Sequence, residues 1–118
     1  FNGELLTTQV TSMVNLIDGY YYNLPSKWVG NIAVLKDTDN RIREVYSYNT
    51  EKMVVGDSLL YMRAIKISDW DKGVYNALNL MEIGRTQDSV IACRIPRVSG
   101  ITFDNAKKSF GIYNQEAK

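Results

Sequence analysis

The chain has 118 residues and a mass of 13.4 kDa, which suits one domain built around one hydrophobic core. Its 45% hydrophobic and 23% charged residues are the balance of a globular domain. A formal net charge of +1 provides no strong field for gathering phosphates, so we expect no general binding of nucleic acid. We therefore treat residues 1–118 as a single domain.

The residue types present restrict the chemistry more than the fold. The chain has no histidine, which removes the usual general base at neutral pH and the commonest metal ligand. Cys93 is its one cysteine, so an internal disulfide and a structural zinc site are excluded, and we expect a small buried hydrophobic side chain there. The sequence predicts no catalytic residues, no metal and no cofactor.

No stretch of the sequence has the signature of membrane insertion or export. There is no run of about 18 apolar residues, and Phe1-Asn2-Gly3-Glu4 lacks a basic segment followed by an apolar core. We expect contact with a membrane only through a lipid anchor or helix that lies outside this sequence.

The first half of the chain reads as strands joined by polar turns. Ser12–Ile17 is a predicted strand, Asp18-Gly19 supplies turn chemistry, and residues 19–24 form a second strand that ends at Pro25. This pattern predicts a hairpin.

A second hairpin and a central strand follow. Asn31–Lys36 and Ile42–Tyr48 are β-prone and flank the polar loop Asp37–Asn40. Leu59–Ile67 is the strongest strand candidate, since it is rich in β-branched and aromatic residues and the turn Gly56-Asp57 precedes it. Its apolar run favours a central position in a sheet.

The next segment has helical spacing. Ser68 followed by Asp71 resembles a capping box, and Trp70, Val74 and Leu78 recur at four-residue steps. The spacing predicts a helix with these three side chains as its buried stripe.

The last part predicts a hairpin and a closing helix. Met81–Gly84 and Ser89–Ile95 pair around a polar turn, and Pro96 ends the second strand. Thr102 caps a helix whose apolar face holds Phe103, Ala106, Phe110 and Tyr113. The order of elements predicts an α+β fold, an antiparallel sheet covered by one or two helices.

Short motifs carry a family resemblance. Residues 19–28 run glycine, aromatic strand, Pro and Trp, Leu59–Trp70 runs from a strand into Ser-Asp-Trp, and Glu82–Ile95 has Ile-Gly-Arg before a polar turn. Over roughly residues 12–113 the chain resembles a domain of uncharacterised lipoproteins and secreted proteins of clostridia and related Firmicutes. The opening motif is also similar to PsbP-like domains, which implies their antiparallel sheet flanked by helices. The resemblance implies a location at the cell envelope or outside the cell, and no assigned catalysis.

The aromatic strand is the candidate ligand-binding segment. Tyr20, Tyr21 and Tyr22 alternate between the two faces of a strand, so at least one ring points outward, and Trp28 follows closely. Such rings stack on a sugar, a peptide or a base. The competing interpretation, which we favour, places Tyr20 and Tyr22 under a helix and Trp28 at one end of the sheet.

Two acidic groups have simpler explanations than a site. Asp37, Asp39 and Asn40 offer oxygen ligands for calcium, but no full loop pattern follows, so we predict a hairpin turn. Asp69 and Asp71 are expected to interact with a helix N-terminus rather than act as an acid–base pair.

Several basic residues would form a local patch only if their strands pair suitably, and dispersed surface charge is the favoured interpretation. They are Arg41, Arg43, Arg63, Lys66, Arg85, Arg94 and Arg97.

Together these features predict a non-catalytic extracytoplasmic binding or interaction domain of a Gram-positive cell-surface lipoprotein, with a protein, peptide or glycan as its ligand. The alternatives are a small hydrolase that uses carboxylate or Ser/Lys chemistry and a sensory appendage of a membrane protein.

Overall fold

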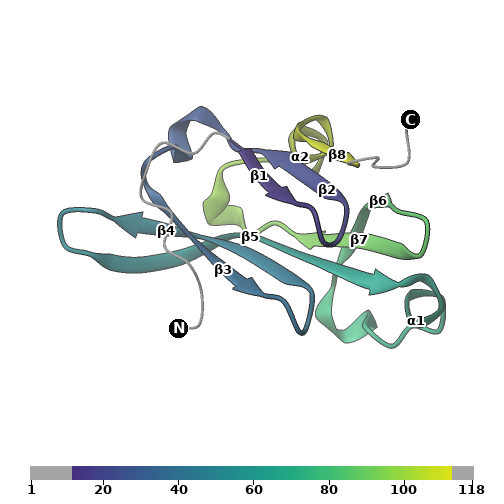
Figure 1. The fold of residues 1–118 in the computed structure, drawn as a ribbon. Helices are drawn as coiled ribbons and strands as arrows, with labels where there is room; N and C mark the ends of the chain where they lie inside the picture. The colour runs from purple at the N-terminus through teal and green to yellow at the C-terminus, as the bar shows by residue number, and fades with distance from the viewer. Residues whose placement is uncertain (1–11, 113–118) are drawn as a thin grey trace.

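The computed structural model of the protein describes residues 12–112, and the expected helical position Tyr113 and the N-terminal Phe1–Glu4 lie outside that range. The first sheet has the order β1-β2-β8, from β1 (Ser12–Asn15), β2 (Tyr20–Asn23) and β8 (Phe110–Ile112). The second has the order β3-β4-β5-β7-β6, from β3 (Ile32–Asp37), β4 (Ile42–Asn49), β5 (Val54–Lys66), β6 (Met81–Arg85) and β7 (Ser89–Arg94). All neighbouring strands are antiparallel (Figure 1).

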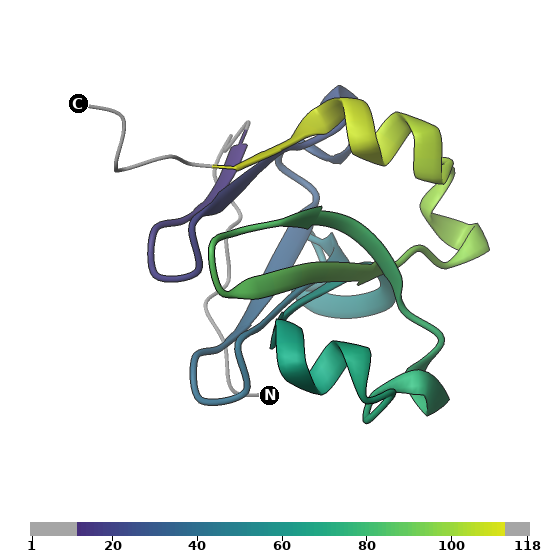
Figure 2. The same cartoon turned by 90° about the vertical axis from the view of Figure 1, so that its right-hand side faces the viewer.

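The expected α+β fold, a sheet covered by helices in a PsbP-like manner, is wrong. The described chain is mostly β, and its helices are short: α1 (Ile67–Asp71) has 5 residues and α2 (Phe103–Ser109) has 7. Three single turns of 3₁₀-helix complete the elements, η1 (Ser26–Trp28), η2 (Asn76–Leu78) and η3 (Arg97–Ser99). The smaller sheet covers most of one face of the five-stranded sheet (Figure 2). The smaller sheet itself joins distant parts of the chain, because β8 near the C-terminus pairs with β2 near the N-terminus.

The three predicted hairpins are confirmed. Asp18-Gly19 lies in the turn between β1 and β2, where Gly19 has a φ of 80° that favours glycine. β3 pairs with β4 around the polar loop, and β6 pairs with β7. These elements were predictable because the two strands of each hairpin are adjacent in sequence and the polar residues between them suit turns.

β5 occupies the predicted central position but begins earlier than expected. Gly56 and Asp57 lie within the strand rather than in a turn, and β5 runs for 13 residues from Val54. The first part of β5 pairs with the end of β4 through an irregular register. In this region β4 no longer pairs with β3, and β5 does not yet pair with β7. The β4–β5 hairpin therefore extends from the body as an arm (Figure 1).

The predicted helix around Trp70 is only partly present. α1 ends at Asp71, Gly73 has a φ of 76°, and Val74 is 60% exposed. The N-cap is Lys66, without a side-chain hydrogen bond, so Ser68 is not the cap. The four-residue spacing was misleading because the left-handed glycine interrupts the helix before its second turn.

The closing helix begins as predicted and ends early. Thr102 accepts a hydrogen bond from the Asn105 backbone, and the Asn105 side chain accepts one from Thr102 N, which completes a capping box. Ala106 is buried, but Phe110 begins β8 instead of extending the helical face. Pairing of Phe110 with Tyr22 gives its backbone strand partners, which explains why the helical pattern fails there.

The main core lies between the two sheets. Tyr20, Tyr22 and Trp28 pack in one cluster with apolar side chains of β3, β4, β5 and β7, and Phe103 and Phe110 of the C-terminal segment pack against it. A smaller cluster on the opposite face joins β5 and β7 to the α1–η2 segment through Ile65, Val90, Ala92, Ile67, Trp70, Tyr75 and Leu80. Figure 2 shows α1 on the side of the five-stranded sheet that faces away from α2 and β8.

Candidate functional site

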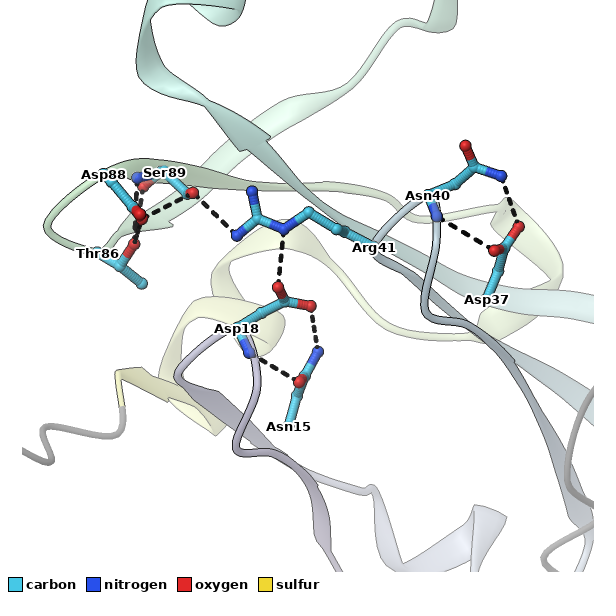
Figure 3. Close-up of polar contacts among 8 residues, drawn as sticks. All are labelled: Asn15, Asp18, Asp37, Asn40, Arg41, Thr86, Asp88 and Ser89. Carbon is cyan, nitrogen blue, oxygen red and sulfur yellow. Dashed lines mark hydrogen bonds and ion pairs between the residues drawn. The ribbon is translucent and has the colours of Figure 1, made fainter.

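Three hairpin loops meet through Arg41 (Figure 3). Arg41 is the last residue of the β3–β4 turn and has a φ of 59°, a conformation uncommon for a residue with a side chain. Its Nε donates to Asp18 Oδ1 at 2.8 Å, and one terminal nitrogen donates to Ser89 Oγ at 3.0 Å. One side chain thus joins the β1–β2 loop to the β3–β4 and β6–β7 loops.

The carboxylate of Asp18 is engaged at both oxygens. Asn15 Nδ2 donates to Asp18 Oδ2 at 2.8 Å, and the Asp18 backbone N–H donates to Asn15 Oδ1 at 3.0 Å. Asn15 is fully buried, and the Asp18 side chain is 7% exposed. This arrangement fixes the β1–β2 loop and supplies a buried carboxylate with the partners that it needs.

Hydrogen bonds within the third loop, the β6–β7 turn, fix its conformation. Ser89 Oγ donates to Asp88 Oδ1 at 3.0 Å, and Ser89 N–H donates to Thr86 Oγ1 at 3.2 Å. The Ser89 hydrogen bond, followed by that of Thr86, lowers the pKa of Asp88. The turn therefore presents a fully buried Ser89 to Arg41 in a fixed position.

Asp37 and Asn40 form the predicted turn rather than an ion site. Asn40 donates to Asp37 through its side chain at 2.9 Å and its backbone at 3.2 Å, and these bonds lower the pKa of Asp37. Asp39 is exposed. Within residues 12–112, His, Cys, Asp and Glu side chains do not gather in groups of three that could hold a metal ion.

The loop that Arg41 fixes carries exposed apolar side chains. Val14 is 52% exposed on β1, and Leu16 and Ile17, in the turn itself, are 56% and 71% exposed. Val14 lies opposite Tyr21 of β2, on the face of the small sheet that points away from the core. We call Val14, Leu16, Ile17 and Tyr21 the hairpin patch.

The ring of Tyr21 lies over the neighbouring strand at Gly111. A side chain at Gly111, its partner in β8, would collide with the ring and hydroxyl of Tyr21. Glycine at this position therefore lets the ring rest on the backbone of the sheet, and the half-buried ring forms part of the outer surface. Of the four aromatic residues proposed for ligand binding, Tyr21 is the one with an outward position.

The other three aromatic candidates are core residues. Tyr20, Tyr22 and Trp28 are 0%, 1% and 5% exposed, so their rings do not form the expected binding face. Tyr20 and Tyr22 belong to β2 of the smaller sheet, whereas Trp28 lies in η1, and all three pack in the main core cluster. The competing interpretation placed the two tyrosines under a helix, but the strand that holds them is part of the smaller sheet. Burial raises the pKa of Tyr20 and of Tyr22 to about 12.

The remaining acidic and thiol candidates have structural positions. Asp69 lies in the first turn of α1 and Asp71 is its last residue, so the two do not cap one helix N-terminus together. Cys93 is fully buried, as predicted, and burial raises the pKa of its thiol to about 12.

The basic residues do not form one patch. Arg41 belongs to the loop junction, Arg43 is buried, and Arg85 pairs with Glu82 at 2.6 Å. Lys66 and Arg97 are exposed. Arg63 and Arg94 are the exception, because strand pairing places both on one face of the large sheet.

An open depression of about 570 Å³ runs along the β4–β5 arm and reaches its connecting turn at Thr50–Lys52. Its lining is largely polar, and Tyr48 is the aromatic residue in it. The depression is therefore not an aromatic groove, and the hairpin patch remains the better candidate for a binding surface.

The sequence pointed to Tyr21 but not to its neighbours. Leu16 and Ile17 were interpreted as ordinary strand residues, whereas both lie in the turn. The available signal was their position directly before Asp18-Gly19, because apolar residues within a turn have no sheet face to bury them.

In the part of the chain that the structure describes, no helix has the length and hydropathy that crossing a bilayer requires. Comparison of the chain with protein-family models, with curated proteins and with solved structures finds no match.

Proposed function

We propose that this chain is a non-catalytic binding domain that acts outside the cytoplasm and recognises its partner through the hairpin patch. The observation that carries the proposal is the exposure of Leu16 and Ile17 on a loop that Arg41 and Asp18 hold rigidly. A preorganised loop loses little conformational entropy on binding, so its apolar side chains can contribute most of their burial energy to affinity. The location outside the cell, on a Gram-positive cell-surface lipoprotein, is supported by the resemblance of residues 12–113.

The chemistry of the patch favours a protein or peptide partner over a glycan. Three of its four members are aliphatic, whereas sugar recognition relies on polar side chains around an aromatic ring. The polar side chains Ser12 and Asn23 lie at the far end of the hairpin from the loop, where the Ser12 hydroxyl donates to Asn23 Oδ1 at 2.8 Å, so they do not surround the patch. We propose that the partner presents apolar side chains that pack on Ile17, Leu16 and the ring of Tyr21.

Selection from a library of random peptides on phage, with the full chain as bait, tests this function. We expect the enriched peptides to be rich in apolar residues. Substitution Ile17→Ser should weaken their binding by roughly tenfold, because a fully buried aliphatic side chain contributes about 1.5–3 kcal/mol.

The matched control is Val98→Ser, since Val98 is 57% exposed and lies in η3. It should leave the affinity of the selected peptides unchanged. Equal loss in both variants, or selected peptides that bind Ile17→Ser as tightly as the parent, would contradict the assignment of the hairpin patch.

A further inference from the structure

The face of the five-stranded sheet that points away from the small sheet carries two arginines side by side. In the β5–β7 register, Tyr61 lies opposite Arg94 and Arg63 lies opposite Ala92. All four residues share a face with Ile65 and Val90, which belong to the smaller core cluster. Arg63 and Arg94 are therefore diagonal neighbours on adjacent strands.

Each of these guanidinium groups is stacked on a tyrosine. The Arg94 guanidinium carbon lies 4.7 Å from the centre of the Tyr61 ring, and that of Arg63 lies 4.6 Å from the centre of the Tyr75 ring. Stacking holds a planar guanidinium in one orientation and leaves its edge N–H groups available as hydrogen-bond donors. Both arginines are thus oriented before any partner arrives.

Their donors are largely unused within residues 12–112. Arg94 donates one hydrogen bond, to the carbonyl oxygen of Leu78 at 3.3 Å, and Arg63 makes no hydrogen bond or ion pair with another described residue. Arg94 is exposed and Arg63 is half-buried. These donors are therefore available to an acceptor that comes from outside this part of the chain.

Nearby carboxylates on this face have other partners. Glu44 accepts from Ser58 Oγ at 2.7 Å and from the Tyr46 hydroxyl at 2.9 Å, and Glu82 pairs with Arg85. Neither carboxylate lies within ion-pair distance of Arg63 or Arg94. Asp37 shares this face through Ile42 and accepts from Asn40, and its pKa is lowered mainly by those hydrogen bonds and further by the charge of Arg63. Among the described residues the two arginines therefore form no ion pair with these carboxylates.

The spacing of the arginines suits an extended peptide. Diagonal neighbours on antiparallel strands are about 7–8 Å apart, and alternate residues of an extended peptide are separated by about 6.6 Å. Alternate residues of an extended peptide point to the same side, as the two arginines do on the sheet. Two carboxylates at alternate peptide positions therefore match the spacing of the two guanidinium groups. A long polyanion fits less well, because the net charge of the chain is only +1.

We propose that this face binds an extended acidic segment of a partner protein, in which carboxylates at alternate residues pair with Arg63 and Arg94. This surface lies on the other side of the large sheet from the hairpin patch and does not depend on the function proposed for that patch.

Fluorescence anisotropy with a labelled octapeptide of four Glu-Thr repeats tests the proposal. We expect binding by the full chain that weakens as salt is raised, and no binding of the matching Gln-Thr peptide. Substitutions Arg94→Gln and Arg63→Gln should each weaken the affinity by roughly tenfold or more, since each removes charge-assisted hydrogen bonds. Arg94→Lys should also weaken it, because lysine keeps the charge and loses the planar stack.

Arg97→Gln is the matched control, because Arg97 is exposed and its guanidinium lies over no aromatic ring of residues 12–112. It should bind as the parent does, and thermal melting should show that every variant is folded. Equal weakening by Arg97→Gln, equal affinity for the two peptides, or no binding of the glutamate peptide would overturn the proposal. Tighter binding of an oligothymidylate than of the glutamate peptide would overturn it in favour of a nucleic-acid ligand.

Discussion

Tyr20, Tyr21 and Tyr22 differ in role although they are consecutive and identical. Strand periodicity predicted that they alternate, and they do: the outer two are buried and the middle one is half-exposed. Which face of β2 is buried depends on its pairing with β8, and the local sequence pattern around β2 does not indicate that distant partner. The alternation was therefore predictable, whereas the choice of Tyr21 as the outward ring was not.

Burial of these tyrosines makes stability sensitive to alkaline pH. The pKa of Tyr20 is raised to about 12 in the folded chain, so the unfolded chain releases that proton first, from about pH 10. The stabilisation is fully present below pH 10 and is lost as pH rises towards 12. Between about pH 10 and 12, each tyrosine with such a raised pKa lowers the free energy of unfolding by up to about 1.4 kcal/mol for every unit that the pH rises.

Tyr20→Phe checks this expectation through urea unfolding at pH 8, 10 and 11. The Tyr20 hydroxyl is buried and has no hydrogen-bond partner among the described residues, so its removal should cost little stability at pH 8. At pH 11 the variant should be more stable relative to the parent than at pH 8. Parallel pH profiles for the two proteins would show that ionisation of Tyr20 does not drive the alkaline loss of stability.

The hairpins and the helices differ in how well local sequence specifies them. Each hairpin was predictable from β-prone runs around a polar turn, because its two strands are neighbours in the chain. Val74 and Phe110 have helical spacing with their neighbours, yet Val74 follows a left-handed glycine and Phe110 enters a strand. Helical spacing alone did not reveal that Gly73 ends the first helix or that pairing with β2 draws Phe110 into a strand.

The loop junction yields a prediction at the level of these elements. Arg41→Ala removes the ion pair with Asp18 and the hydrogen bond with Ser89, and it leaves a nearly buried carboxylate without its cation. Because the Arg41 side chain is 30% exposed, we expect a loss below that of a fully buried pair, about 2 kcal/mol in the free energy of unfolding.

Urea denaturation measures that loss, with Arg97→Ala as the exposed counterpart that should change stability by no more than about 0.5 kcal/mol. Binding of peptides selected on the hairpin patch should weaken in Arg41→Ala as well, since the loop would no longer be held. A variant as stable as the parent would show that the three loops do not depend on Arg41.

The whole molecule is two sheets packed face to face, and its core depends on contacts between distant parts of the chain. Trp28 follows the small sheet's second strand in sequence and packs among residues of the large sheet, with Phe110 of β8 packed against the same cluster. An α+β fold was expected because the long-range β2–β8 pairing could not be read from local pattern. Trp28 was a candidate binding residue and, in the interpretation that we favoured, a residue at one end of the sheet; its burial agrees with a structural position.

Truncation of that residue tests the architecture as a whole. Trp28→Ala should lower the free energy of unfolding by about 3–5 kcal/mol, because Trp28 is 5% exposed and its removal leaves a cavity between the sheets. Thermal melting and urea unfolding should both report the loss. An unchanged melting temperature would mean that the indole is a surface contact group and that the core is closed by other residues.

The buried position of Cys93 has a practical consequence for work on this protein. Its thiol is fully enclosed and remains protonated near neutral pH, so a maleimide dye added to the folded chain should leave it unmodified. A cysteine introduced at an exposed position such as Val98 would then be the reactive thiol among the described residues. Fluorophores and spin labels can accordingly be attached at a chosen point without first replacing the native cysteine.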